Sequence, residues 1–171
     1  MNRIKAREKQ GDEIRSAVKE INSLKAELRE IKNLNPYQLH QCVKISNSVF
    51  GIGFHSNEYF IYKKIDKIIA FYKGEIIGFL IVKKSIKAII IDSIAIAKNW
   101  QRKKIGTSLL SFYFEEKTTG KEKVSAYAWK VKNNTPAGKL NSKFGLKPIE
   151  SLGKIWEKKC NVSFHCIHYT N

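Results

Sequence analysis

Residues 88–110 read "AIIIDSIAIAKNWQRKKIGTSLL" and decide the fold. An almost unbroken apolar run comes first, a basic polar loop follows, and an apolar helix begins at the end. A strand that is apolar on both faces is typical of the buried centre of a sheet. The N–H groups that begin a helix have no partner inside it and attract anions. The stretch therefore predicts a central strand followed by a loop that holds a pyrophosphate, with Gly106 allowing close approach of the ligand.

Strands and helices alternate on both sides of this stretch. Before it, residues 68–84 predict a hairpin that turns at Lys73-Gly74-Glu75. After it, the pattern predicts a helix at 105–118, a strand at 123–131, a helix at 133–146, and closing strands at 154–159 and 162–170. This order is typical of an α/β domain with a mixed central sheet flanked by helices.

The N-terminal segment has a pattern of its own. Residues 10–34 predict a helix that ends before Pro36, because the residue before a proline resists helical geometry. Its apolar residues follow a heptad seam: Ile14, Ala17, Ile21, Leu24, Leu28 and Ile31. The seam favours either self-association as a coiled coil, in a homodimer, or an ordinary amphipathic helix packed on the domain. We expect an N-terminal helix within 1–34 and one domain over 35–171, with short helices at 37–67.

The charge of the chain is strongly positive. Thirty-two Lys and Arg stand against fifteen Asp and Glu, which gives a net charge of +17. Residues 1–34 contribute nine basic and six acidic side chains, so the excess lies mainly in 35–171. Such a surface attracts nucleic acid, acidic proteins or a phosphorylated ligand; a generally lysine-rich composition is the plain alternative. An odd number of cysteines, no secretory signal and no apolar run of ~20 residues predict a cytoplasmic protein without membrane contact.

Two segments resemble the GNAT N-acyltransferases. Residues 94–110, "IAIAKNWQRKKIGTSLL", resemble the acyl-CoA-binding motif of that family, usually written Q/R-x-x-G-x-G/A. Residues 133–146, "NNTPAGKLNSKFGL", resemble its second motif, N-x-x-A-x-x-x-Y-x-x-x-G-F. The resemblance covers about 37–171. It implies a GNAT-like sheet, acetyl-CoA as co-substrate, and transfer of an acetyl group to a primary amine on a protein, a small molecule or a nucleic acid.

The resemblance also implies the residues that contact the cofactor. The backbone at the end of the central strand would bind the pantetheine arm, and the amides of 102–107 would bind the diphosphate. Asn134 would contact the cofactor from the opposite strand. The implied set is Ile94, Ala95, Ile96, Gln101, Arg102, Lys103, Lys104, Ile105, Gly106, Thr107, Asn134 and Asn141.

The chain departs from the family pattern at three positions. Lys104 replaces the first glycine of the acyl-CoA motif. Asn141 stands where many relatives have a tyrosine that protonates the CoA thiolate, and an amide has no titratable proton. Trp129 stands where some relatives carry a glutamate base. These departures leave open an alternative: a catalytically weak GNAT-fold module that binds nucleic acid or an acidic partner.

Two residues are candidates for the proton transfer. Asp92 lies inside the apolar central strand, where a carboxylate is costly unless it has a role or a partner. His55, in "GFHSNEYF" (53–60), would border the acceptor groove. The alternatives are a strand-edge or turn-capping role for Asp92, a plainly exposed His55, and water as the base.

The C-terminal segment gathers Cys160, His165, Cys166 and His168. Their number suits a zinc site, but their spacing is irregular. Because successive residues of a strand point to opposite faces, His165 and Cys166 do not readily share a metal. We therefore predict no metal.

Overall fold

The computed structural model describes residue 12 and residues 26–84, 88–118, 125–131, 135–144, 147–148 and 162–168. The strands form one seven-stranded sheet in the order β1-β2-β3-β4-β5-β7-β6. They are β1 (Glu27–Glu30), β2 (Ile65–Tyr72), β3 (Glu75–Lys84), β4 (Ala88–Ile96), β5 (Ser125–Val131), β6 (Lys147–Pro148) and β7 (Val162–His168). The helices are α2 (Pro36–Phe50), α3 (Asn57–Ile61), α4 (Ile105–Thr118) and α5 (Thr135–Lys143), with a 3₁₀ turn at Lys98–Trp100.

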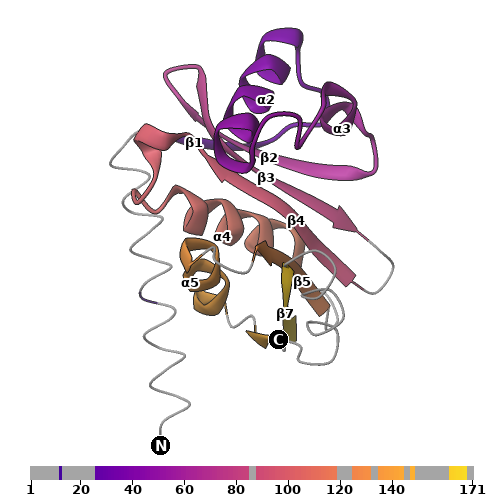
Figure 1. The fold of residues 1–171 in the computed structure, drawn as a ribbon, viewed down its shortest axis with the longest axis vertical. Coiled ribbons are helices and arrows are strands. Elements are labelled where there is room, and N and C mark those ends of the chain that lie inside the picture. Colours follow the sequence, from indigo (N-terminus) through magenta and orange to yellow (C-terminus); the bar gives the residue numbers. More distant parts are fainter. Residues whose placement is uncertain are drawn as a thin grey trace, which may run out of the picture.

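Helices cover both faces of the sheet. Figure 1 shows α2 and α3 on one face and α4 and α5 on the other. The strands alternate between the two cores: Ile69 and Phe71 of β2 face α2 and α3, whereas Ile68 and Ala70 face α4. A strand buried on both faces needs apolar residues at every position, which explains why β2, β3 and β4 read as continuous apolar runs. We call these two sides of the sheet the α2/α3 face and the α4 face.

The predicted hairpin, central strand and mixed sheet are confirmed. β2 and β3 turn at Lys73 and Gly74, whose φ angles of 49° and 83° suit a tight hairpin turn. β4 is the fourth of the seven strands and pairs with β3 antiparallel and with β5 parallel. The predicted strand at 162–170 is β7, while the one predicted at 154–159 lies outside the described residues.

The predicted helix over 10–34 is wrong at its C-terminal end. Residues 27–30 form β1, which pairs antiparallel with β2, so that Leu28 lies opposite Ala70. The edge of β2 offers unpaired backbone groups, and pairing with them outweighs a weak local helix preference. Pro36 instead begins α2, where Asn35 and Gln38 form a capping box. Residues 10 and 11 and 13–25 lie outside the described residues, so self-association stays a prediction.

The sheet opens in its middle. The parallel ladder between β4 and β5 runs from Ala88, opposite Ser125, to Ile91, opposite Ala128, although both strands continue beyond it. At the same place the register with β3 shifts, which leaves Asp92 without an opposite residue. Such a β-bulge bends a strand and increases its twist. The ladder with β5 and the regular register with β3 therefore both end beside Asp92.

Candidate active site

The end of β4 directs backbone groups toward the opening. The amide of Ala97 donates to the carbonyl of Ile77 at 2.9 Å, so this residue faces β3. In an antiparallel pair alternate residues face the partner strand, and the backbone groups of Ile94 and Ile96 therefore face the side where the β5 ladder has ended. This direction agrees with the pantetheine contacts that the resemblance implies. The side-chain amide of Gln101 donates a hydrogen bond to the Ile96 carbonyl at 3.1 Å, so this carbonyl does face away from β3.

The loop after β4 ends in the N-terminus of α4. The carbonyl of Lys104 accepts the first helical hydrogen bond, from the amide of Ser108 at 3.1 Å. The amides of Ile105, Gly106 and Thr107 form the first turn and have no acceptor within the helix. An anion at this position would accept these N–H groups and gain from the helix dipole. The first turn of α4 therefore offers backbone N–H groups at the place where the diphosphate site is predicted.

Gly106 has a packing role beside the predicted approach of a ligand, which stays a prediction. A Cβ atom there would lie 3.3 Å from Leu140 Cδ2 of α5 and 3.6 Å from Ile94 Cδ1 of β4. The absent side chain lets α4 pack closely on these two neighbours. Its φ is not positive, so the left-handed conformations of the loop fall elsewhere, at Arg102 and Lys104 (φ 64° and 56°).

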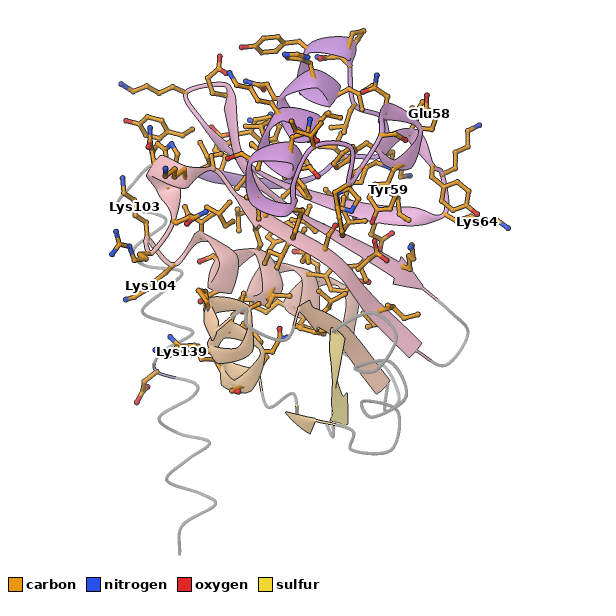
Figure 2. The ribbon with its side chains drawn as sticks, in the orientation of Figure 1. Glu58, Tyr59, Lys64, Lys103, Lys104 and Lys139 are labelled. Carbon is orange, nitrogen blue, oxygen red and sulfur yellow. The ribbon has the colours of Figure 1, made fainter. Side chains whose placement is uncertain are left out.

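Basic side chains surround the loop. Arg102, Lys103 and Lys104 are exposed, as is Lys139 of α5. Figure 2 shows Lys103, Lys104 and Lys139 along one side of the molecule, close to the start of α4. The Lys103 ammonium lies 4.5 Å from the centre of the Trp100 ring, a cation–π contact. This basic rim adds positive charge at the place where the helix amides already favour an anion.

Lys104 has a left-handed backbone conformation, with a φ of 56°. A side chain at positive φ costs about 1 kcal/mol, which a glycine does not incur. Lys104→Gly is therefore expected to raise the free energy of unfolding by up to about 1 kcal/mol, whereas Lys104→Ala, which keeps a Cβ, is expected to give no gain. Urea unfolding at pH 7 measures both variants. Equal stabilities of the two would show that this φ imposes no strain.

Asp92 has partners on both of its oxygens. The Tyr59 hydroxyl of α3 donates to Oδ2, and the Lys83 ammonium of β3 lies 2.6 Å from Oδ1. The side chain of Asp92 is 16% exposed, and burial raises the pKa of its carboxyl. Burial increases the proton affinity of the carboxylate, and its place beside the opening of the sheet suits it to accept a proton. Sequence reasoning found Asp92 but missed Tyr59 and Lys83, which no motif marks.

His55 is buried, against the expectation of an exposed side chain. It is 5% exposed, its Nδ1 lies 2.8 Å from the Ser46 hydroxyl, and its ring stacks on Tyr59 with centroids 4.1 Å apart. Burial and the nearby Lys83 charge lower the pKa of His55 from 6.5 to about 4. The imidazole is therefore neutral at pH 7. The side chain of Tyr59 lies between the imidazole and the Asp92 carboxylate.

Ser93 adds an unpaired polar group next to Asp92. Its side chain is 6% exposed, and its hydroxyl is the one buried side-chain oxygen or nitrogen in the described part of the chain that has no hydrogen-bond partner. A buried hydroxyl without a partner costs free energy.

The remaining predicted residues give less information. Asn141 is buried on α5, whereas Asn134 and Cys160 lie outside the described residues. Trp129 pairs with Phe164 of β7, the strand that also carries His165, Cys166 and His168; the side chains of both strands at these positions are not described. Among the described side chains, no group of three His, Cys, Asp or Glu is arranged to hold a metal. None of the described helices has the length and apolarity that crossing a bilayer requires.

Comparisons with known proteins identify the family of this chain and structures with a similar fold. A family model described as an acetyltransferase (GNAT) domain matches residues 57–147, more than half of the chain. The fold is similar to Ard1 from Thermoplasma volcanium, with 14% identity and a TM-score of 0.69 over 85% of this chain and 99% of that one. It is also similar to the PaiA N-acetyltransferase of Thermoplasma acidophilum in complex with coenzyme A, with 15% identity and a TM-score of 0.66 over 84% of this chain and 99% of that one. A third similar structure is a GNAT family acetyltransferase of Elizabethkingia anophelis with acetyl-CoA bound, with 14% identity and a TM-score of 0.63 over 84% of this chain and 98% of that one. No curated protein matches the sequence. The likeness of the structures confirms the predicted GNAT-like fold.

Proposed function

Because this chain belongs to the GNAT acetyltransferase family, we propose that it transfers an acetyl group from acetyl-CoA to a primary amine. One observation carries the proposal: the sheet opens beside Asp92, and the same strand leads through a short basic loop into the N-terminus of α4. The first feature makes room for a thioester arm, and the second binds its diphosphate. The two similar structures with coenzyme A or acetyl-CoA support this choice of co-substrate.

The residues of this chain would contact successive parts of the co-substrate, from the end of β4 to the start of α4. The backbone groups of Ile94 and Ile96 face the opening and would hydrogen-bond the pantetheine amides. The amides of residues 105–107 would bind the diphosphate, with Arg102 and Lys104 adding charge. This arrangement leaves the thioester near the bulge at Asp92. Asn134, Asn141 and the side chain of Lys103 complete the proposed binding set.

The proposed chemistry requires one proton acceptor. The amine nitrogen attacks the thioester carbonyl, the C–S bond breaks, and the thiolate leaves with its electron pair. The proton lost by the nitrogen passes to the Asp92 carboxylate, and the thiolate takes a proton from water, since Asn141 has none to give. Holding amine and thioester together supplies most of the rate enhancement. We assign His55 a supporting role, because it is neutral, buried and one ring further from the carboxylate.

Calorimetry with acetyl-CoA tests the co-substrate site. Arg102→Glu with Lys104→Glu is expected to weaken binding by about tenfold to a hundredfold, because each reversal places a negative charge beside the diphosphate. The matched control is Lys63→Glu with Lys64→Glu, which makes the same change in net charge at exposed positions after α3. Lys64 lies on the side of the molecule opposite Lys103 and Lys104 (Figure 2). Equal affinities of the two double variants, or no heat with the wild type at millimolar ligand, would contradict the site.

The positive charge supports a second candidate function. The basic rim and the net charge of +17 favour a binding module for nucleic acid or an acidic protein. This second function is favoured if the protein binds acetyl-CoA but releases no CoA when a panel of amines is supplied. RNA binding that weakens steeply as salt rises would then identify the partner.

A further inference from the structure

A continuous row of side chains leads from α2 to the bulge in β4. The Ser46 hydroxyl on α2 lies 2.8 Å from His55 Nδ1, and the imidazole stacks on Tyr59 with 15° between the ring planes. The Tyr59 hydroxyl donates to Asp92, and Lys83 lies 2.6 Å from the other carboxylate oxygen. These five groups come from α2, the loop after it, α3, β4 and β3. The tertiary fold alone brings them together.

The carboxylate of Asp92 is fixed from two directions. Tyr59 reaches Oδ2 from α3, and Lys83 reaches Oδ1 from the neighbouring strand. Each carboxylate oxygen has two lone pairs, so one donor on each leaves acceptor capacity for a substrate N–H. Two donors on different oxygens fix the rotation of the carboxylate plane, which a single donor does not. They also favour the ionised form that accepts a proton.

The ring of Tyr59 is held in turn. The imidazole of His55 covers one face, Phe60 meets the ring edge-on at 5.5 Å, and the Lys83 ammonium lies 5.6 Å from the ring centre. The hydrogen bond to Ser46 sets the rotation of the imidazole. A buried, neutral imidazole in this row therefore orients Tyr59 and does not itself reach the carboxylate.

We propose that Tyr59 and Lys83 are positioning residues that orient the Asp92 carboxylate and keep it ionised. Ser46 and His55 in turn hold the ring of Tyr59 in place. The inference rests on the proposed function, in which Asp92 accepts the proton of the amine. The alternative is a purely structural clasp that fastens α3 to β4. A clasp would contribute to stability while the carboxylate takes no part in the reaction, so the acid limb of the pH profile would not depend on it.

The pH dependence of the reaction separates these alternatives. Among the described side chains, the titratable groups around Asp92 are Tyr59 from α3, Lys83 from β3 and, one ring further, His55. On the same face α2 contributes the buried thiol of Cys42, and β2 contributes the buried Lys67, whose ammonium donates to the Tyr62 carbonyl at 3.4 Å. The charged rim of the α4 loop belongs to the opposite side of the sheet.

Tyr59→Phe keeps the stacked ring and removes only the donor. We expect the acid limb of the kcat/KM profile to move to higher pH by about one unit, because the anion loses a hydrogen bond. We expect Lys83→Met to shift it in the same direction and Lys83→Arg to restore most of the wild-type profile, with KM for acetyl-CoA unchanged in all three. Tyr62→Phe, at an exposed tyrosine just after α3, is the matched control and is expected to behave as wild type.

An acid limb that stays in place in both Tyr59→Phe and Lys83→Met would overturn the proposal in favour of the clasp. A readout independent of turnover distinguishes this failure from failure of the proposed function. The carboxyl ¹³C shift of Asp92, followed against pH in the ligand-free protein, reports its pKa directly. A higher pKa in Tyr59→Phe together with a shifted acid limb supports the positioning role, and an unchanged pKa contradicts it even if no amine is acetylated. Lys83 is partly exposed, so its variants keep the test valid if Tyr59→Phe does not fold.

Discussion

Asp92→Asn is expected to lower kcat/KM for the acceptor amine by about 10²–10⁴-fold, the range that a general base contributes. The substitution keeps the size of the side chain and one oxygen for Lys83, but an amide accepts no proton at neutral pH. The affinity for acetyl-CoA is expected to stay within about twofold, because the diphosphate and pantetheine contacts are made by the backbone further along the chain. Release of CoA thiol measures the rate, and calorimetry measures the affinity.

A matched control is available on the neighbouring part of the sheet. Asp66 on β2 also accepts from a tyrosine hydroxyl, that of Tyr113 at 3.2 Å, and this tyrosine belongs to α4 on the opposite face. Asp66→Asn therefore disturbs a comparable hydrogen bond without touching the opening of the sheet. We expect it to keep wild-type kcat/KM. A loss of similar size in both variants would assign the effect to general damage, and a loss below about threefold in Asp92→Asn would leave water as the proton acceptor.

His55 is expected to make the fold sensitive to acid. The pKa of its imidazole is lowered from 6.5 to about 4, mainly by burial and further by the Lys83 charge. Between these two values the unfolded chain binds a proton that the folded chain excludes, so stability is complete above pH 6.5 and falls as the pH drops toward 4. A shift of this size corresponds to roughly 3 kcal/mol. Urea unfolding at pH 7 and pH 4.5 measures the loss.

His55→Phe is expected to remove most of this pH dependence. The variant keeps an aromatic ring against Tyr59 but has no titratable group, so the stability difference between pH 7 and pH 4.5 should shrink by about 2–3 kcal/mol. Its stability at pH 7 is expected to fall by about 1–3 kcal/mol, because the Ser46 hydroxyl loses its partner. His40→Gln, at an exposed position of α2, is the control and should keep the wild-type dependence. An unchanged dependence in His55→Phe would show that other groups cause it.

The two motifs were enough to predict the centre of the fold. The apolar run of β4, the hairpin before it and the basic loop after it follow from local rules: period, turn residues and helix starts. These rules depend on neighbours in the chain, which is why the bounds of β2, β3, β4 and α4 lie close to the predicted ones. The prediction of a helical heptad seam failed at residues 27–30 for the opposite reason. The partner of that segment is β2, from Glu30 opposite Ile68 to Glu27 opposite Phe71, and no local rule reaches that far along the chain.

The sequence by itself determined the fold class, the family resemblance and Asp92 as an unusual charge in an apolar strand, and it predicted an anion site at the start of α4. Only the tertiary structure decided what surrounds that charge: Tyr59 and Lys83 on the carboxylate, and His55 buried behind the tyrosine. It also decided that Gly106 serves helix packing. The physical reason is the range of each interaction. Backbone patterns are set within a few residues, whereas burial, pairing of charges and pKa values depend on groups that meet only when distant segments pack together.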